Sequence, residues 1–286
     1  MTPLDYDYLR KLVRARSGLA LGSEKKYLVE SRLLPVMRRA GVDDISALVR
    51  KLRAGDAEQL IVDIVDAMAT KETFFFRDKV PFEQLRTVIL PELLRTRAAR
   101  KRIRIWCAAC STGQESYSVA MAVKEMADRL SGWKVEIIAT DLSNEVLDRA
   151  RAGIYSQFEV QRGLPIHMLI KYFTQVGEMW AVSPVIREMV RHQRINLLDD
   201  FSKLGIFDLV FCRNVLIYLD QETKAEILAR IARVTDPTGC LILGSAETVV
   251  GLADAWKPHD EHRGLFTLAK PSVPLPRLSV LGGARG

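Results

Sequence analysis

The sequence predicts an α/β fold: a doubly wound, Rossmann-like sheet preceded by a small all-helical domain and carrying a small inserted β-subdomain. Three observations favour this class. From residue 103 onward, short apolar segments alternate with helical patterns, which is typical of a mostly parallel sheet covered by helices. Residues 4 to about 70 contain helical patterns only, and residues 154–190 interrupt the alternation with glycines, prolines and aromatic residues.

Four apolar stripes at helical spacing predict the helices of the first domain, which we place at residues 1–78 together with the start of a linker. Glycines at positions 18, 22, 41 and 55 separate the stripes. The stripes are Leu9, Leu12 and Val13; Leu28, Leu33, Leu34 and Met37; Ile45, Leu48, Val49 and Leu52; and Leu60, Ile61, Ile64, Val65 and Met68.

The second domain is expected over residues 79–270, beginning with a linking helix over 79–94 that has Pro81 near its start. We expect the insert, about 154–190, to form a few antiparallel strands, and residues 271–286, with three prolines and paired glycines, to form a flexible tail. The expected strands are 103–107, 135–140, about 191–196, 207–212, 240–244 and 265–268, the helices are near 114–130, 143–152 and 220–234, and the insert's strands lie around Tyr172, Phe173, Met179, Trp180 and Val182.

The composition excludes several classes of protein. No run of 18 apolar residues occurs, so we expect no membrane-spanning helix. The first ten residues lack an apolar signal region, and the four cysteines lie in or beside predicted core strands. Both features favour a reducing cytoplasm over secretion.

The net charge of +7 permits attraction to an acidic partner, although solvated basic faces are the simpler interpretation for most of the arginines. Neither basic cluster has the interleaved aromatic residues of a single-strand nucleic-acid groove. The clusters are Lys25, Lys26, Arg32, Arg38 and Arg39 on one predicted helix, and Arg95, Arg97, Arg100, Lys101, Arg102 and Arg104 before the first strand.

The most informative pattern is the junction of a strand and a helix at residues 104–115. An apolar strand meets a run of small residues with Gly113, and an apolar-periodic helix follows. Small residues let the backbone approach a ligand, and the first amides of a helix point at it. The next predicted strand ends at Asp141, whose carboxylate suits the two hydroxyls of a ribose. The pattern predicts an adenosine-cofactor site, with an ordinary α/β core turn as the alternative.

The turn contains one glycine and lacks the G-x-G-x-x-G pattern of a pyrophosphate site. A cofactor without phosphates needs less exposed backbone, so the turn favours S-adenosylmethionine over NAD. Cys107 and Cys110 have the spacing of a redox pair, but without the surrounding thioredoxin pattern we interpret them as core thiols. His259 and His262 lie in a polar stretch without an H-E-x-x-H motif, and we expect no metal site.

Residues 71–78, 108–115, 139–141 and 207–218 resemble, in this order, the motifs of the CheR family of chemoreceptor methyltransferases. The resemblance runs from about residue 5 to about residue 269. It implies an S-adenosylmethionine-dependent methyltransferase domain that acts on glutamate side chains of bacterial chemoreceptors. The products would be glutamate methyl esters and S-adenosylhomocysteine.

The resemblance also implies the site residues. Glu115 would accept the methionine amine, although an acid at a helix N-terminus is also favoured by the dipole. Asp141 would bind the ribose, and Ser143 competes for the alternative role of capping the next helix. Lys71 stands where the family usually has asparagine, so a cofactor contact there stays open. The cofactor-binding set is Thr73, Arg77, Glu115, Asp141, Asn196, Leu197, Arg213 and Asn214, with Leu197 over the adenine, and the catalytic set is Arg77, steering the acceptor carboxylate, and Tyr218, near the methyl group.

The implied partners are the glutamate-rich cytoplasmic helices of chemoreceptors, and the basic helix of the first domain suits docking to them. Some family members also bind a receptor's C-terminal pentapeptide through the insert. Only residues 174–195 lie between Tyr172-Phe173 and Asn196-Leu197, so we expect no such tether. A nucleic-acid methyltransferase is the first alternative, but the chain lacks the Asn-Pro-Pro-Tyr and Pro-Cys motifs of that class. A non-catalytic S-adenosylmethionine-binding signalling module is the second. We expect neither nucleic-acid binding nor membrane insertion.

Overall fold

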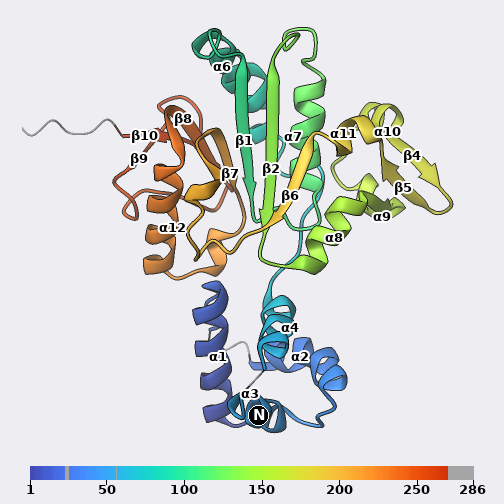
Figure 1. The fold of residues 1–286 in the computed structure, drawn as a ribbon, viewed down its shortest axis with the longest axis vertical. Helices are drawn as coiled ribbons and strands as arrows, with labels where there is room; N and C mark the ends of the chain where they lie inside the picture. The colour runs from blue at the N-terminus through green and yellow to red at the C-terminus, as the bar shows by residue number, and fades with distance from the viewer. Residues whose placement is uncertain (23–25, 56, 270–286) are drawn as a thin grey trace, which may run out of the picture.

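The computed structural model describes residues 1–22, 26–55 and 57–269 (Figure 1). Four helices form a bundle that lies below one end of a seven-stranded sheet, and a three-stranded sheet projects from the side of the larger domain (Figure 1). The predicted fold class is confirmed. The predicted tail, residues 271–286, and Lys25 of the predicted basic helix lie outside the described residues.

The helical bundle follows the apolar stripes of the sequence. Its helices are α1 (Pro3–Ser17), α2 (Lys26–Ala40), α3 (Ile45–Arg53) and α4 (Glu58–Met68). Thr2 and Asp5 form a capping box at the start of α1. The stripe prediction is wrong for Leu34, which is exposed, because Leu33 already faces the core and the next residue lies about 100° around the helix axis. No helix in the described part of the chain is both long and apolar enough to cross a membrane.

The linking helix is present but irregular. It consists of α5 (Val80–Gln84), a π-helical stretch η2 (Leu85–Ile89) and α6 (Leu90–Thr96). Pro91 has no amide hydrogen, and its ring crowds the preceding turn of an ordinary α-helix. The wider π turn accommodates it, since Leu90 donates its backbone hydrogen bond to Leu85.

The main sheet has the order β6-β2-β1-β7-β8-β10-β9. Its first five members are parallel, and β10 and β9 are antiparallel. The strands are β1 (Arg102–Ala108), β2 (Lys134–Asp141), β6 (Val190–Arg194), β7 (Phe207–Cys212), β8 (Thr235–Leu243), β9 (Trp256–Pro258) and β10 (Leu265–Leu268). The short β9 was not predicted.

Two strand boundaries differ from the sequence prediction. β6 ends at Arg194, two residues early, and β8 begins at Thr235, before the expected start at residue 240. The register with β7 shifts between Phe207 and Leu209, so the extra residues of β8 bulge out of the ladder. Gly239 permits this bulge, because a Cβ atom there would lie 2.8 Å from the backbone oxygen of Asp208.

Alternating side chains of β1 pack into two cores on opposite faces of the sheet. Ile103, Ile105 and Cys107 pack with the linking helix and α7 (Gln114–Lys124). Trp106 and Ala108 pack with α12 (Gln221–Arg233) on the other face.

The helix α8 (Asn144–Ala152) follows β2. The chain from 125 to 130 was predicted to continue α7, but its hydrogen bonds shorten to turns such as Met126 N–H to the Val123 oxygen.

The second basic cluster has a structural role. The buried Arg97 donates to the carboxylate of Asp208 at 2.7 Å and to that of Asp236 at 2.6 Å. Asp208 also accepts from the backbone amide of Arg104 at 2.8 Å. These bonds join the linking helix to the starts of β1 and β7, so Arg97 is a buried structural residue and is not part of a solvated basic face.

The insert contains the predicted antiparallel strands and three short helices that were not predicted. Its sheet has the order β3-β5-β4, from β3 (Ile154–Ser156), β4 (Phe173–Val176) and β5 (Met179–Val182). The helices are α9 (Gln157–Gln161) and α10 (Ile166–Tyr172), and the short α11 (Pro184–Arg187) follows the sheet. Apolar side chains on the exposed faces of α9 and α10, such as Phe158, Ile166 and Ile170, obscure the helical period in the sequence.

Candidate active site

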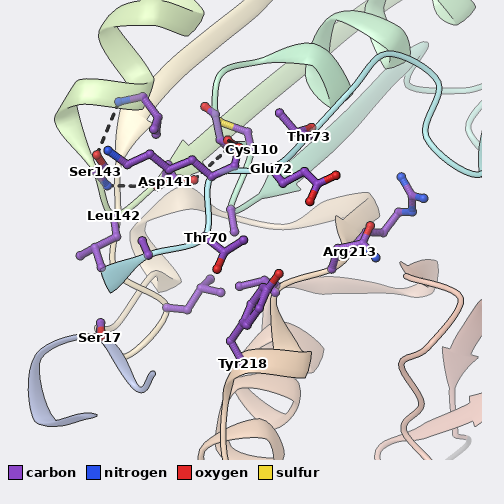
Figure 2. Close-up of a pocket in the computed structure, with 18 of the residues that line it drawn as sticks. Ser17, Thr70, Glu72, Thr73, Cys110, Asp141, Leu142, Ser143, Arg213 and Tyr218 are labelled. Carbon is purple, nitrogen blue, oxygen red and sulfur yellow. Dashed lines mark hydrogen bonds between the residues drawn. The ribbon is translucent and has the colours of Figure 1, made fainter. Parts of the chain in front are cut away.

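A pocket opens where the carboxyl ends of β1, β2 and β7 meet the helical bundle (Figure 2). In the close-up, Asp141 and Ser143 lie on one side of the cavity, and Tyr218 and Arg213 lie on the other. The structure brings together every residue of the predicted site. Thr73, Arg77, Glu115, Asp141, Asn196, Leu197, Arg213, Asn214 and Tyr218 all line the pocket, and so does Lys71.

The turn after β1 curls through three left-handed residues, Ala109 (φ 55°), Ser111 (φ 50°) and Gly113 (φ 96°). Close packing of neighbouring residues requires a glycine at position 113. A Cβ atom there would lie 2.9 Å from the Cβ of Ala150 and 3.1 Å from the hydroxyl of Tyr155. The single glycine of the motif therefore lets α8 and the insert pack against the turn.

Asp141 is fixed by the backbone on both sides of it. Oδ2 accepts from the Ser111 amide at 2.9 Å, and Oδ1 accepts from the Ser143 amide at 3.0 Å. Burial raises the pKa of Asp141, while the backbone hydrogen bonds from Ser143 and Ser111 oppose that rise. The capping role falls to Ser143, whose hydroxyl accepts from the Val146 amide. A carboxylate has about four acceptor sites, so Asp141 keeps room for hydroxyl donors.

Arg213 is the buried centre of a charge cluster behind the pocket. Its side chain is fully buried and donates to Glu115 Oε2 at 2.8 Å, Asp78 Oδ2 at 2.7 Å and the backbone oxygen of Arg77 at 2.8 Å. Burial raises the pKa of Glu115, and the positive charge of Arg213 opposes the rise. Within the described residues, Glu115 Oε1 has no hydrogen-bond donor. Glu115 can thus accept a ligand's ammonium group while Arg213 holds its other oxygen.

The segment before the linking helix forms the rim of the pocket. Phe75 and Phe76 are core residues, and Phe74 stacks under the guanidinium of Arg77 at 5.5 Å. Arg77 spends one nitrogen on the backbone oxygen of Glu72, at 3.2 Å, and guanidinium has five N–H donors. Lys71, which lines the pocket, binds Glu145 of α8 at 2.7 Å.

The first domain contributes pocket residues that the sequence analysis missed. Ser17 and Leu19 line the cavity, and Leu19 forms an antiparallel bridge with Leu219. The side chain of Asn196 donates to the backbone oxygen of Arg16 at 2.8 Å and accepts from the Leu198 amide. Nothing in the local sequence around these residues indicates this contact between the domains. Leu142 and Val146 also line the pocket, and the position of Leu142 directly after Asp141 was a usable signal.

The other candidate chemistries receive no support. Burial raises the pKa of Cys107 and of Cys110 well above the ordinary range, which disfavours the thiolate that redox chemistry needs. Across residues 1–22, 26–55 and 57–269, no group of three or more His, Cys, Asp and Glu side chains is placed to hold a metal ion.

The lining fits an adenosine cofactor that carries an amino acid. Asp141 offers acceptors for a diol, Glu115 offers one for an ammonium group, and Leu142, Val146 and Leu197 supply apolar surface for a base.

Comparison with known proteins agrees with this fit. Residues 4–69 match the all-alpha domain of CheR methyltransferase, and residues 71–264 match its SAM-binding domain. The chemotaxis protein methyltransferase Cher2 of Pseudomonas putida is 41% identical over 271 residues, which cover 93% of this chain and 98% of that protein. Chemotaxis protein methyltransferase 1 of Pseudomonas aeruginosa is 42% identical over 272 residues, with the same coverage of each chain. The chain belongs to the CheR family of S-adenosylmethionine-dependent chemotaxis protein methyltransferases.

Proposed function

We propose that the pocket holds S-adenosylmethionine against Asp141 and Glu115 while a chemoreceptor glutamate enters beside Arg77 and Tyr218. The observation that supports this proposal is that two carboxylates, each held by different partners, line the same cavity. Asp141 is held by backbone amides and suits the ribose diol, and Glu115 is held by Arg213 and suits the methionine amine. We assign the adenine to the apolar surface of Leu197 and Leu142, which line the same cavity.

The acceptor needs no general base. A glutamate side chain has a pKa near 4.3, so it is almost entirely ionised at pH 7. S-adenosylmethionine supplies the methyl group, and the work of the protein is to align the acceptor and exclude water. Arg77 has guanidinium donors left to steer the incoming carboxylate, and Tyr218, which lines the same cavity, carries a hydroxyl.

We place receptor docking on α2 of the first domain. Arg32 is turned inward, since it donates to the backbone oxygen of Met68, and Arg39 lies 3.6 Å from Asp63. Arg38 is exposed and has no ion-pair partner among the described residues. Replacing Arg38 and Arg39 by alanine should slow methylation at low salt and leave cofactor affinity intact, because exposed charges act mainly on encounter. Equal methylation rates of the variant and the parent at low salt would show that receptors dock on another surface.

We further propose that receptors are recognised in the cytoplasm without a pentapeptide tether. The hairpin of the insert is short, with four residues in β4 and four in β5. A receptor C-terminal pentapeptide added in excess should leave the methylation rate of a receptor fragment unchanged. Competition by the peptide would show that the insert binds it.

The proposed reaction is tested by radiolabelled methyl transfer to receptor cytoplasmic fragments, followed by treatment with base. A glutamate methyl ester releases its label as methanol, whereas a methylamine keeps it. Binding of S-adenosylhomocysteine without transfer would favour a non-catalytic signalling module. Base-stable label on added RNA or DNA would favour a nucleic-acid methyltransferase.

A further inference from the structure

The loop after β7, residues 213–218, carries one wall of the pocket but has little regular structure of its own. Only its end forms a short 3-10 turn, η4 (Leu216–Tyr218). Asn214 is left-handed, with φ at 57°. Such a loop needs support from elsewhere to hold a single conformation.

Glu247 supplies that support from the loop after β8. Its Oε2 accepts from the amides of Asn214 and Gly244, both at 2.7 Å. Its Oε1 accepts from three successive amides, at 3.0 Å, 2.8 Å and 3.3 Å, which belong to Val215, Leu216 and Ile217. Four of the five donors are therefore consecutive amides of the pocket loop, and hydrogen bonds to an ionised acceptor are stronger than neutral ones.

Gly244 gives a second, independent indication that the chain is built around this contact. A Cβ atom at this position would lie 2.7 Å from Glu247 Oε2, 2.7 Å from Asn214 Nδ2 and 3.0 Å from the Asn214 amide nitrogen. Any larger residue would thus wedge the carboxylate away from the loop. The glycine preserves the approach of Glu247 to Asn214.

We propose that Glu247 is a positioning residue that fixes Asn214 and Tyr218 at the reacting end of the pocket by holding the intervening amides. Asn214 and Tyr218 line the pocket, and Glu247 is not part of that lining. It lies instead in a neighbouring hollow with Asp78 and His259, so its effect passes through the backbone of the loop. The inference rests on the proposed role of Tyr218 in methyl transfer.

Replacing Glu247 by glutamine keeps the size of the side chain but puts an NH2 group against at least two of the amide donors. We expect kcat to fall by about 10- to 100-fold, while the Kd of S-adenosylhomocysteine changes by less than about 3-fold. Hydrogen exchange of the amides of residues 214–217 should accelerate, and that of residues 141–146 should not. Rates are expressed per S-adenosylhomocysteine-binding site, which corrects for unfolded protein. Glu261→Gln is the matched control, because Glu261 is exposed.

Two further variants keep the test decisive if Glu247→Gln folds poorly. Glu247→Asp keeps the anion but withdraws it by one methylene, so its kcat should lie between those of the parent and of the glutamine variant. Gly244→Ala keeps the carboxylate but displaces it, and should lower kcat with little change in cofactor affinity. Parental kcat per binding site in these variants would overturn the proposal, as would equal losses of kcat and affinity without faster exchange at 214–217. Absence of methyl transfer by the parent would instead count against the proposed function.

Discussion

The two walls of the pocket are built by different means. On one side, Ser111, Asp141 and Ser143 continue directly from the ends of β1 and β2, and bonds between the neighbouring strand ends fix them, such as the Cys110 amide to the Thr140 oxygen at 2.9 Å. On the other side, the loop from Arg213 to Tyr218 is held by groups far away in the sequence. The strands of the sheet themselves fix the first wall. The second wall, residues 213–218, is held in place by contacts from other parts of the chain, and we call it the assembled wall.

The assembled wall depends on the helical domain as well as on Glu247. The Ala20 amide donates to the backbone oxygen of Tyr218 at 2.9 Å, and Leu19 pairs with Leu219. Arg14 of α1 binds Asp220, the N-cap residue of α12, at 2.6 Å. The domain proposed to meet the receptor is therefore bonded to the loop that carries the proposed catalytic tyrosine.

The largest effect is expected from breaking the charge cluster behind the assembled wall. Arg213→Met removes a fully buried cation and leaves Glu115 and Asp78 without their shared partner. Such a loss typically lowers the free energy of unfolding by about 3–5 kcal/mol. Urea unfolding measures it, with Arg233→Met as the control at an exposed position of α12. A loss no greater than that of the control would mean that Arg213 does not organise this wall.

A smaller and different effect is expected on the wall built by the sheet. Asp141→Ala should weaken S-adenosylhomocysteine binding by about 1.5–3 kcal/mol, the usual contribution of hydrogen bonds to a charged acceptor. The turnover at saturating cofactor should change less than in Glu247→Gln, since the opposite wall is intact. Calorimetry and saturation kinetics separate the two quantities, and Asp148→Ala on the exposed face of α8 is the control. An unchanged affinity would remove Asp141 from the cofactor site.

How much of the site could be predicted from the sequence depends on whether a residue lies near the end of a predicted strand or reaches the pocket from another part of the chain. Asp141 is the last residue of β2, Arg213 directly follows β7, and Glu115 lies in the first turn of the helix after β1. The carboxyl ends of neighbouring parallel strands meet at one edge of the sheet. Ser17, Leu19 and Glu247 follow no such rule. A serine at the end of a helix or an acid in a loop normally faces solvent, and only the folded chain shows what these residues contact.

The same distinction applies to the fold. The central strands β1 and β7 could be located closely, because each contains a run of four apolar residues, 105–108 and 209–212, that is buried in the structure. The start of β8 and the short helices α9 and α10 could not be located from the sequence. A bulge at Gly239 and exposed apolar side chains such as Ile170 mask the local periods that would reveal them.

The smallest effect is expected at Lys71, a pocket-lining residue whose side chain is partly exposed. Lys71 and Glu145 form an ion pair in which Glu145 is largely exposed, and such pairs contribute about 0–1 kcal/mol. Lys71→Asn, which restores the family's usual residue, should therefore leave S-adenosylhomocysteine affinity unchanged or slightly improved. Glu145→Gln breaks the same pair from the other side and should behave alike. A clear loss of affinity in Lys71→Asn, but not in Glu145→Gln, would show that Lys71 has taken over a contact to the cofactor and belongs to the site itself.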